Sequence, residues 1–538
     1  MEILLVVPRY NLTNKKNYKY DFPFGLGYIS SVLKKAHYNV DCLNLNHHNG
    51  TVKEILKSFL DKKKYDFVCT GHMGIGYHMI KNIVDSVRTH PSSPKIIIGG
   101  AIIISEPELM FNSLKPDFAV IGEGEITIIE LLDSIKKNND LKKVDGIMYL
   151  DDNGNLVVTK KREPIKDLDF IPFPDFEGLG FEEKIENSYT NESFHSNILD
   201  NPRAYPILCS RGCPFKCTFC YHPLGEGYRM RTIKNIIKEL EWAMKKYRIN
   251  IFSFYDEIFA VNKERLFELC KEIKNLTRKF PWESKWACQL TVQNVDEETL
   301  KMLKDSGCIL VSYGFESFSS EVLRSMKKPI TPEQIDSAIK LTRKVGLALS
   351  GNFIFGDVAE TKDTAYKTLD YWEKNCYGQV NMDFVQPYPG SEIYRHCIRK
   401  GLIKDKLEFI KNIGIQNSLN MTNSMTDEDM SRLKMDITRA LAMHRYRNSA
   451  QIIYMKKKSK YLYNLKIKCP FCKEKIEYQN FRTKNKLYFV NVLICRNCYM
   501  HFIVTSSVKS LIYRFYSVLY PLMGYYVKIR NRRLKKEV

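Results

Sequence analysis

The sequence predicts an α/β protein with two successive α/β regions and a smaller cysteine-containing module. In the first 140 residues, short apolar runs alternate with helical stretches, and the same alternation returns between residues 204 and 401. Near the C-terminus, four cysteines fall in two Cys-x2-Cys pairs. Strands that alternate with helices are typical of parallel sheets covered on both faces. A chain of 538 residues has room for several such domains.

Residues 1–140 predict a doubly wound, flavodoxin-like or Rossmann-like sheet. Its first strand is the apolar run 3–7, and a helix opens at residues 25–33. Ligands of such sheets bind beyond the carboxyl ends of the strands, where glycine lets the backbone approach a ligand closely. The candidate binding residues are those that follow the predicted strands 67–70, 96–98 and 118–121, namely Gly71, His72, Gly99, Gly100, Gly122, Glu123 and Gly124.

Residues 141–203 predict a linker. The segments 145–150 and 156–159 flank the turn 151–154, which has the composition of a β-hairpin.

Residues 204–401 predict a partial, TIM-like (β/α)6 barrel. Six strand-like segments recur with helices between them, at 204–208, 251–255, 286–290, 309–313, 347–355 and 379–385. The active face of such a barrel lies at the carboxyl ends of its strands. The candidate site residues at those ends are Asp256, Glu257, Gly314, Glu316 and Asn352.

Three cysteines follow the first of these strands. Cys213, Cys217 and Cys220 have the spacing Cys-x3-Cys-x2-Cys, which can hold three corners of a 4Fe-4S cluster and leave one iron open to a small molecule. Cys209 lies outside this spacing. The alternatives are a zinc knuckle or reduced structural thiols, although zinc sites more often pair two Cys-x2-Cys units.

The segment 211–220, Arg-Gly-Cys-Pro-Phe-Lys-Cys-Thr-Phe-Cys, resembles the signature of radical S-adenosylmethionine (SAM) enzymes. The resemblance implies that the three cysteines are the catalytic cluster ligands and that SAM chelates the open iron. It also implies that Phe219 and Asn352 lie near the adenine, Asp256 and Glu257 near the SAM amino group, and Gly314 and Glu316 near its ribose and carboxylate. An external reductant, such as flavodoxin or ferredoxin, is then expected.

The N-terminal region is similar to the cobalamin-binding domain of one radical SAM subclass. The segments 23–28, 98–100 and 120–125 carry this resemblance. An Asp-x-His-x-x-Gly loop is absent from the sequence, so cobalamin is expected to bind through the strand-end residues without a lower axial histidine. The alternative is a degenerate domain that has lost the corrinoid.

Residues 402–460 predict a helical cap, and residues 461–505 predict a zinc-ribbon-like module. Cys469, Cys472, Cys495 and Cys498 fit the closed tetrahedral shell of a structural zinc ion. An auxiliary iron–sulfur cluster is the alternative.

Residues 506–538 form a basic, aromatic tail. The net charge of the chain is +22, and residues 451–538 carry +17 of it, from 20 Lys and Arg residues and 3 Glu residues. This charge indicates an anionic partner, which could be a membrane surface, an acidic substrate or, less favoured, nucleic acid. The alternative is a solvated lysine-rich surface without a partner. The uncharged segment 515–527 is too short to cross a bilayer, so the tail is expected to act as an interfacial anchor or to dock on the protein body.

The first residues do not resemble a signal peptide, and the fifteen cysteines favour a reducing compartment. A cytoplasmic location is expected, with the tail at the inner face of the membrane.

Together these features predict a cobalamin-dependent radical SAM C-methyltransferase acting on an unactivated carbon of an unknown substrate. One alternative uses the same cofactors for rearrangement, cyclisation or ring contraction. Another, of a different class, is a non-catalytic iron–sulfur and zinc protein that binds nucleic acid or membrane.

Overall fold

The computed structural model describes residues 1–10, 13–72, 74–187, 198–225, 227–413, 419–483, 485–513 and 515. The chain forms two compact units, each assembled from three segments. The first unit comprises Met1–Ser188, Cys209–Glu239 and Gln386–Leu419, and the second comprises Tyr189–Leu208, Leu240–Val385 and Asn420–Val538. The loop with the three clustered cysteines therefore belongs to the first unit.

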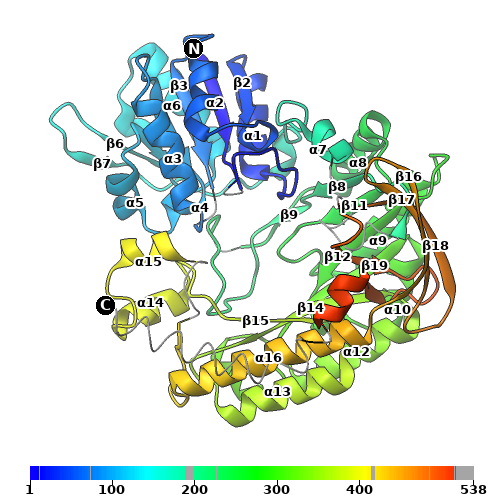
Figure 1. The fold of residues 1–538 in the computed structure, drawn as a ribbon. Coiled ribbons are helices and arrows are strands. Elements are labelled where there is room, and N and C mark those ends of the chain that lie inside the picture. The colour runs from blue at the N-terminus through cyan, green and yellow to red at the C-terminus, as the bar shows by residue number, and fades with distance from the viewer. Residues whose placement is uncertain are drawn as a thin grey trace. The chain divides into compact units, whose positions relative to one another are not determined.

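The first unit is built on a seven-stranded sheet with the order β2-β1-β3-β4-β5-β6-β7 (Figure 1). Its strands are β1 (Glu2–Val7), β2 (Asn39–Asn44), β3 (Phe67–Gly71), β4 (Lys95–Gly99), β5 (Phe118–Val120), β6 (Ile147–Leu150) and β7 (Leu156–Val158). β1 to β5 are parallel, as predicted for a doubly wound sheet. β6 and β7 form the predicted hairpin, but they pair antiparallel onto β5 and so extend the sheet instead of lying in a separate linker.

Helices cover both faces of this sheet because its central strands are apolar on both sides: Ile3 to Val7 of β1 are all fully buried. The helices are α1 (Phe24–Lys35), α2 (Val52–Leu60), α3 (Tyr77–Arg88), α4 (Ala101–Ile104), α5 (Pro107–Leu114) and α6 (Gly124–Lys137). α1 packs on α6, while α2, α3 and α5 share one core with the alternate residues Leu4, Val6 and Val68. The unit is completed by α7 (Phe181–Asn187), β9 (Ser210–Arg211), β10 (Arg229–Met230), α14 (Glu392–Arg399) and α15 (Lys406–Asn412).

The second unit contains a six-stranded sheet in which every neighbouring pair of strands is parallel. Its strands follow chain order: β8 (Ala204–Ile207), β11 (Ile251–Phe254), β12 (Lys285–Leu290), β13 (Cys308–Glu316), β14 (Ala348–Phe355) and β15 (Asn381–Phe384). The intervening helices are α8 (Ile233–Tyr247), α9 (Lys263–Thr277), α10 (Glu297–Asp305), α11 (Ser320–Ser325), α12 (Pro332–Val345) and α13 (Lys362–Asn375). All six predicted strands are present, and the open order with β8 and β15 at the edges is that of a partial barrel.

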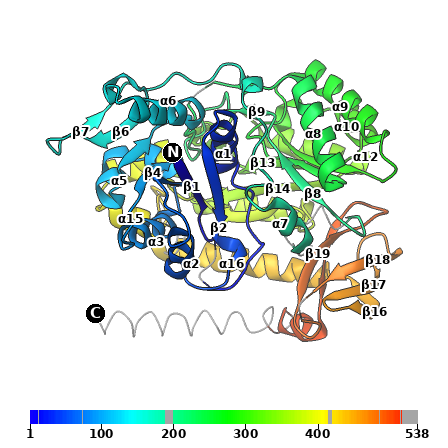
Figure 2. The ribbon, with the colours of Figure 1, turned by 90° about the horizontal axis from the view of Figure 1, so that it is seen from above.

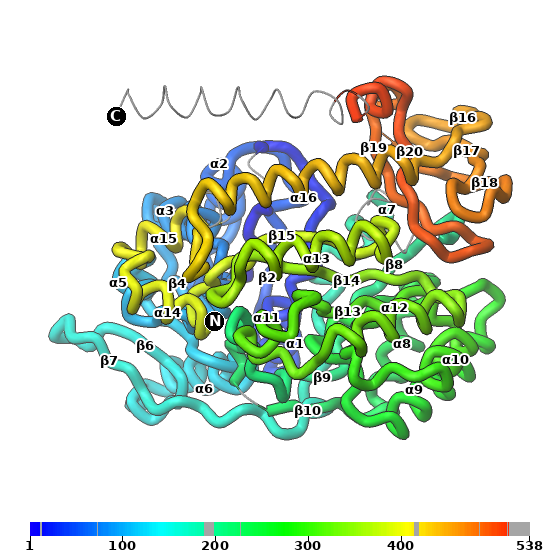
Figure 3. Tube along the Cα trace, turned by 90° about the horizontal axis from the view of Figure 1, so that it is seen from below, coloured from blue at the N-terminus to red at the C-terminus, as the bar shows by residue number. Residues whose placement is uncertain are grey.

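The predicted helical region contains α16 (Asp427–Arg447), which packs against α13 (Figure 3). The strands β16 (Gln451–Ser459), β17 (Leu462–Lys468) and β18 (Lys475–Arg482) then form an antiparallel sheet (Figure 2), followed by the hairpin of β19 (Val490–Ile494) and β20 (His501–Thr505). Residues 451–459 were expected in the helical cap, but they pair along their length with β17 and form a strand.

Among the helices that the structure describes, none combines the length and the apolarity needed to cross a membrane.

The start of α16 gives a first prediction. Thr426 accepts a hydrogen bond from the Asp429 backbone N–H (3.2 Å), and the Asp429 carboxylate accepts one from the Thr426 N–H (3.1 Å), which is a capping box. Thr426→Ala should cost about 1 kcal/mol and speed hydrogen exchange in the first turn of α16 about fivefold. Exchange mass spectrometry measures this effect.

Thr438→Ala in the middle of the same helix is the matched control, because the Thr438 hydroxyl only donates to the Lys434 carbonyl within the helix. Equal exchange in the two variants at residues 427–430 would contradict a capping role for Thr426.

Candidate functional site

The three-cysteine loop of the first unit begins and ends in a short two-stranded ribbon. β9 and β10 pair through Arg211 and Arg229, with the loop between them. Gly212 has φ +79°, and a side chain there would overlap the carbonyl oxygen of Gly227, so the loop closes only with glycine at this position. The Cys220 N–H donates to the Cys217 carbonyl (3.1 Å), which forms a tight turn between the last two cysteines.

Cys217 is buried, whereas Cys213, Cys220 and Phe219 are partly exposed. All fifteen cysteines lie among the described residues, and each of them is a thiol outside any disulfide. Three thiols on a constrained loop fit the ligand set of an iron–sulfur cluster. The assignment of Cys213, Cys217 and Cys220 as ligands stays a prediction.

Two arginines tie this loop to the doubly wound sheet of the same unit. Arg211 donates to Glu123 (2.7 Å) and to Glu125 (2.5 Å), and Arg229 donates to Glu123 (2.8 Å). The Glu123 side chain is only 2 % exposed. The Ile165 backbone N–H also donates to Glu123 (2.6 Å), so this carboxylate has three donors. The turn after β5 is thus bonded to the two strands that frame the cysteine loop.

The charges in this cluster are mutually stabilised. Burial alone would raise the pKa of Glu123, but the hydrogen bond from Arg229 and the charge of Arg211 outweigh it and hold the pKa below its usual value. Burial alone would lower the pKa of Arg211, and the carboxylate of Glu125 reverses this effect. Glu123 and Arg211 are therefore both ionised at neutral pH.

Sequence reasoning placed Glu123 among the cobalamin contacts and did not single out Arg211, Arg229 or Glu125 as functional residues. In the structure the Glu123 carboxylate is engaged by the two arginines. The available signal was a Gly-Glu-Gly-Glu turn in one motif and an arginine two residues before the first cysteine of the other.

The strand-end glycines fall into two groups. A side chain at Gly71 would lie 2.6 Å from the Gly99 carbonyl oxygen, one at Gly100 would lie 2.9 Å from the His72 carbonyl oxygen, and one at Gly124 would press on Ile29. Backbone packing requires glycine at Gly71 and Gly100, whereas the contact at Gly124 is with the tip of a side chain that can move. By contrast, Gly99 meets only Val120 at an ordinary 3.7 Å, and no described atom lies within 4 Å of the Gly122 position.

His72 follows β3, and its ring packs against Tyr10 with 5.2 Å between ring centroids. Of the predicted cobalamin contacts, Gly99 and Gly122 have the free space that an approaching ligand needs. All of these contacts stay predictions.

In the second unit, the predicted SAM residues gather at the carboxyl edge of the barrel sheet. Gly314 and Asn352 are direct neighbours on β13 and β14, and the register shifts between Gly314 and Glu316. Glu316 has φ +59° and pairs with Lys328 (2.9 Å). A side chain at Gly314 would collide with the Glu316 carboxylate, so glycine leaves room for that group.

Asp256 and Glu257 follow β11 at the same edge, since all six strands are parallel. Asp256 is buried and Glu257 is exposed. These positions match the sequence-based placement on strand ends, and their contacts with SAM stay predictions.

A buried carboxyl group that sequence reasoning did not single out lies in the turn after β14. Burial raises the pKa of Glu360 to about 8, although its carboxylate accepts a hydrogen bond from the Gly356 N–H. The turn thus closes on its own carboxyl group.

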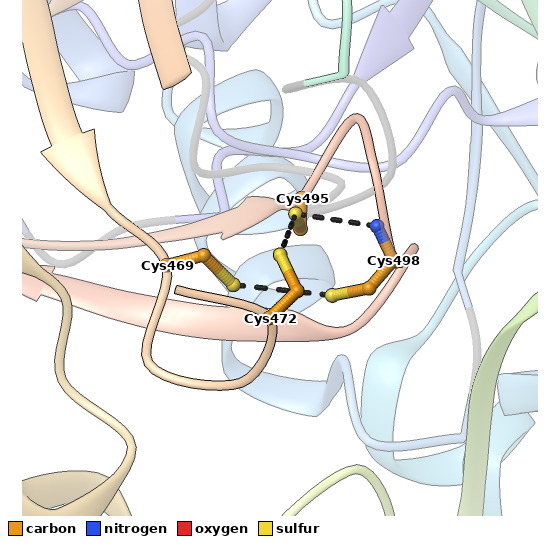
Figure 4. Close-up of side chains that lie close together, drawn as sticks. All are labelled: Cys469, Cys472, Cys495 and Cys498. Atoms are coloured by element: carbon orange, nitrogen blue, oxygen red, sulfur yellow. Dashed lines mark hydrogen bonds between the residues drawn. The ribbon is translucent and has the colours of Figure 1, made fainter. Parts of the chain in front are cut away.

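The four C-terminal cysteines of the second unit converge on one point (Figure 4). Cys469 Sγ lies 3.9 Å from Cys498 Sγ, and Cys472 Sγ lies 3.6 Å from Cys495 Sγ. Spacing alone had placed these four in one site, and the structure brings them together.

Comparison with known proteins agrees with both α/β regions. Residues 207–371 match the family model described as the Radical SAM superfamily, and residues 16–132 match the B12 binding domain. The chain therefore contains a radical SAM domain and a B12-binding domain. The two matches fall on the two regions whose motifs carry the corresponding resemblances.

Among the relatives of this chain, the uncharacterized methyltransferase PH0819 of Pyrococcus horikoshii is 28% identical over 75% of the chain and 84% of the relative. The anaerobic magnesium-protoporphyrin IX monomethyl ester cyclase of Rubrivivax gelatinosus is 26% identical over 73% of the chain and 70% of the relative. The radical SAM methyltransferase TsrM of Kitasatospora setae, solved with cobalamin and a [4Fe-4S] cluster, superposes with a TM-score of 0.61 at 17% identity, over 74% of this chain and 78% of TsrM. This last likeness shows the fold.

The arginine cluster gives the second prediction. Arg211→Met would leave buried carboxylates short of a partner and should lower the free energy of unfolding by about 3 kcal/mol, measured by urea denaturation of the anaerobic protein. Lys57→Met removes an exposed pair with Asp61 and is the control, with an expected change below ~1 kcal/mol. Equal losses in both variants would contradict the role of the buried cluster.

The pH dependence checks the same cluster independently. Because the pKa of Glu123 is lowered in the folded protein, its contribution is present above the unfolded value of about 4.3 and is lost as the pH falls through the folded pKa. Glu123→Gln should therefore flatten the acid limb of the stability curve. An unchanged acid limb would mean that Glu123 is not the group responsible.

Proposed function

We propose that this protein is a cobalamin-dependent radical SAM methyltransferase that adds a methyl group to an unactivated carbon. The observation that carries the proposal is the presence of a B12-binding domain and a radical SAM domain in one chain. The relatives named methyltransferase support the same reaction class. A radical SAM domain also favours an enzyme over a non-catalytic binding protein.

The residues of this chain fit the cofactors that the reaction needs. Cys213, Cys217 and Cys220 would hold a 4Fe-4S cluster through three thiolates. Gly99 and Gly122, where a side chain would meet little of the protein itself, would let a corrin ring approach the backbone at the carboxyl edge of the first sheet. When bound, the cluster supplies the electron that cleaves SAM, and the corrinoid supplies the methyl group.

The barrel residues would orient SAM. Asp256 and Glu257 offer carboxylate oxygens to an amino group, and Asn352 offers an amide at the neighbouring strand ends. Glu316, held by Lys328, is fixed in a left-handed backbone conformation, which points to a position set by function. In this proposal the barrel residues bind and position SAM.

A second candidate function keeps both cofactors and catalyses a rearrangement, cyclisation or ring contraction. The relative named as a cyclase favours it. The two functions differ in the product, because only methyl transfer adds a carbon atom.

The proposed partners are an external one-electron reductant such as flavodoxin or ferredoxin, and an anionic membrane surface that the basic tail would contact. Most of that tail, from residue 516 onward, lies outside the described residues. Sedimentation with anionic and neutral vesicles, at low and high salt, tests the membrane contact; binding to neither kind of vesicle would contradict it.

The test of function uses anaerobically purified, reconstituted protein. Iron–sulfur and corrinoid absorbances should both be present, and SAM carrying an isotope-labelled methyl group should transfer the label to a small-molecule extract. Formation of 5′-deoxyadenosine without label transfer would favour the second candidate. The absence of any retained corrinoid would contradict both candidates.

The cysteine loop gives the third prediction. Cys213→Ala, Cys217→Ala and Cys220→Ala should each abolish the cluster and SAM cleavage, because a cubane then lacks a corner ligand. Cys209→Ser, at a buried cysteine outside the spacing, should leave both intact. Unchanged iron content in Cys217→Ala would contradict the assignment.

The strand-end glycines give the fourth prediction. Gly99→Val should block corrinoid retention while the protein stays folded, because a Cβ at this position meets only Val120, at an ordinary 3.7 Å. Gly71→Ala should instead lower the melting temperature, since its side chain would lie 2.6 Å from a carbonyl oxygen. His72→Ala should at most weaken corrinoid binding. Full corrinoid retention in a stable Gly99→Val protein would contradict the proposed binding edge.

A further inference from the structure

We propose that Cys469, Cys472, Cys495 and Cys498 bind one zinc ion, and that the module around this ion closes the amino-terminal edge of the barrel sheet. We call residues 451–505, which carry β16 to β20, the ribbon module. The proposal adds a metal site and a structural role that are separate from the radical chemistry.

The sulfur geometry points to a single metal ion. All four Sγ atoms lie within 4.8 Å of one another; Cys469 Sγ and Cys498 Sγ are 3.9 Å apart, and Cys472 Sγ and Cys495 Sγ are 3.6 Å apart. Four thiolates at ~2.3 Å around a tetrahedral zinc ion lie about 3.8 Å apart. In an iron–sulfur cluster the thiolates bind different irons and spread farther apart. The spacing therefore favours one ion over an auxiliary cluster.

The two Cys-x2-Cys turns have the same backbone geometry. Cys469 N–H donates to the Glu474 carbonyl, and Lys473 N–H donates to the Cys469 carbonyl. Cys495 and Tyr499 repeat these bonds in the second turn, with Cys495 N–H donating to the Met500 carbonyl and Tyr499 N–H to the Cys495 carbonyl. Lys473 and Tyr499, each four residues after its first cysteine, both have positive φ, +66° and +58°.

The repeated geometry orients each pair of thiols toward the other pair (Figure 4). In addition, the Cys498 N–H donates to Cys495 Sγ (3.4 Å), which stabilises a thiolate at that position. Two matching turns that converge on four sulfurs form a closed ligand shell, as in structural zinc sites.

A pair of polar side chains attaches the ribbon module to the barrel sheet of the same unit. The Gln379 side chain accepts from the His501 N–H (2.9 Å) and donates to the His501 carbonyl (2.9 Å). The His501 Nε2–H lies within reach of the carbonyls of Leu349 (2.9 Å) and Gln379 (3.1 Å). Gln379 lies just before β15, and Leu349 lies at the start of β14. The attachment is therefore at the amino-terminal edge of the barrel sheet.

Apolar and charged contacts at the second turn extend this attachment. Ile494 and Tyr499 belong to one apolar cluster with Ala287, Leu310 and Ala348, which lie near the starts of β12, β13 and β14. Arg496, between the last two cysteines, donates to the Ile198 carbonyl (2.8 Å) and to Asp200 (2.6 Å).

The predicted SAM residues lie at the opposite, carboxyl edge of the same parallel sheet. A metal that fixes the second turn therefore holds Ile494, Arg496 and Tyr499 against the barrel without reaching the reacting groups. Its role is structural.

Metal analysis of the full-length, reconstituted protein tests the ion. About one zinc per chain is expected beside the iron of the cluster. Cys495→Ser should remove the zinc and keep the iron, whereas Cys217→Ala should remove the iron and keep the zinc. Cys42→Ser, at a partly buried cysteine of the first unit, is the control that should change neither metal. Loss of iron from Cys495→Ser, with zinc absent from the unsubstituted protein, would overturn the zinc assignment.

Hydrogen exchange tests the closing role. In Cys495→Ser, amides at residues 308–311 and 347–350 should exchange about tenfold faster than in the unsubstituted protein. Gln379→Ala should accelerate the same amides while it retains zinc, which separates detachment of the module from its unfolding. Unchanged exchange of these amides in a zinc-free Cys495→Ser protein would overturn the role.

Discussion

The pairing of Arg211 with Glu123 and Glu125 is the interaction on which the organisation of the first unit depends. It joins the turn that ends β5 to the strand that opens the cysteine loop. The segments are far apart in sequence, and two buried carboxylates with their arginine partners hold them together. A buried ion pair of this kind stabilises a fold little more than apolar packing would. Separating the two charges is costly, however, so the pair enforces one arrangement of the loop.

The glutamates of the two units differ in what they contact. In the first unit the carboxylates are occupied by arginines, and the open surface is left to glycine at Gly99 and Gly122. In the second unit, Asp256, Glu316 and Asn352 retain polar groups at the strand ends, with Glu316 fixed by Lys328. We therefore expect the backbone to contact one proposed cofactor and side chains to contact the other.

The features that could be predicted from the sequence are those that depend on a local pattern of residues. The central strands, such as residues 3–7, were found because they are apolar on both faces, and the four C-terminal cysteines were grouped because their spacing defines a ligand set. Glu123 was placed on the correct turn, but its arginine partners could not be predicted. An ion pair between segments that are distant in sequence has no characteristic residue spacing. The strand at 451–459 was missed because its lysines are exposed, so it lacks the apolar alternation of a buried strand.

The three-segment composition of the first unit bears on how the protein is made. The Ile393 N–H donates to the Thr218 carbonyl (2.9 Å), so residues near α14 are part of the setting of the cysteine loop. Those residues are translated long after Cys220 and only once the barrel strands β11 to β15 have been made. During synthesis, the loop therefore waits in a nascent chain without its full set of neighbours. We expect its thiols to be less shielded from solvent before α14 leaves the ribosome than in the finished fold.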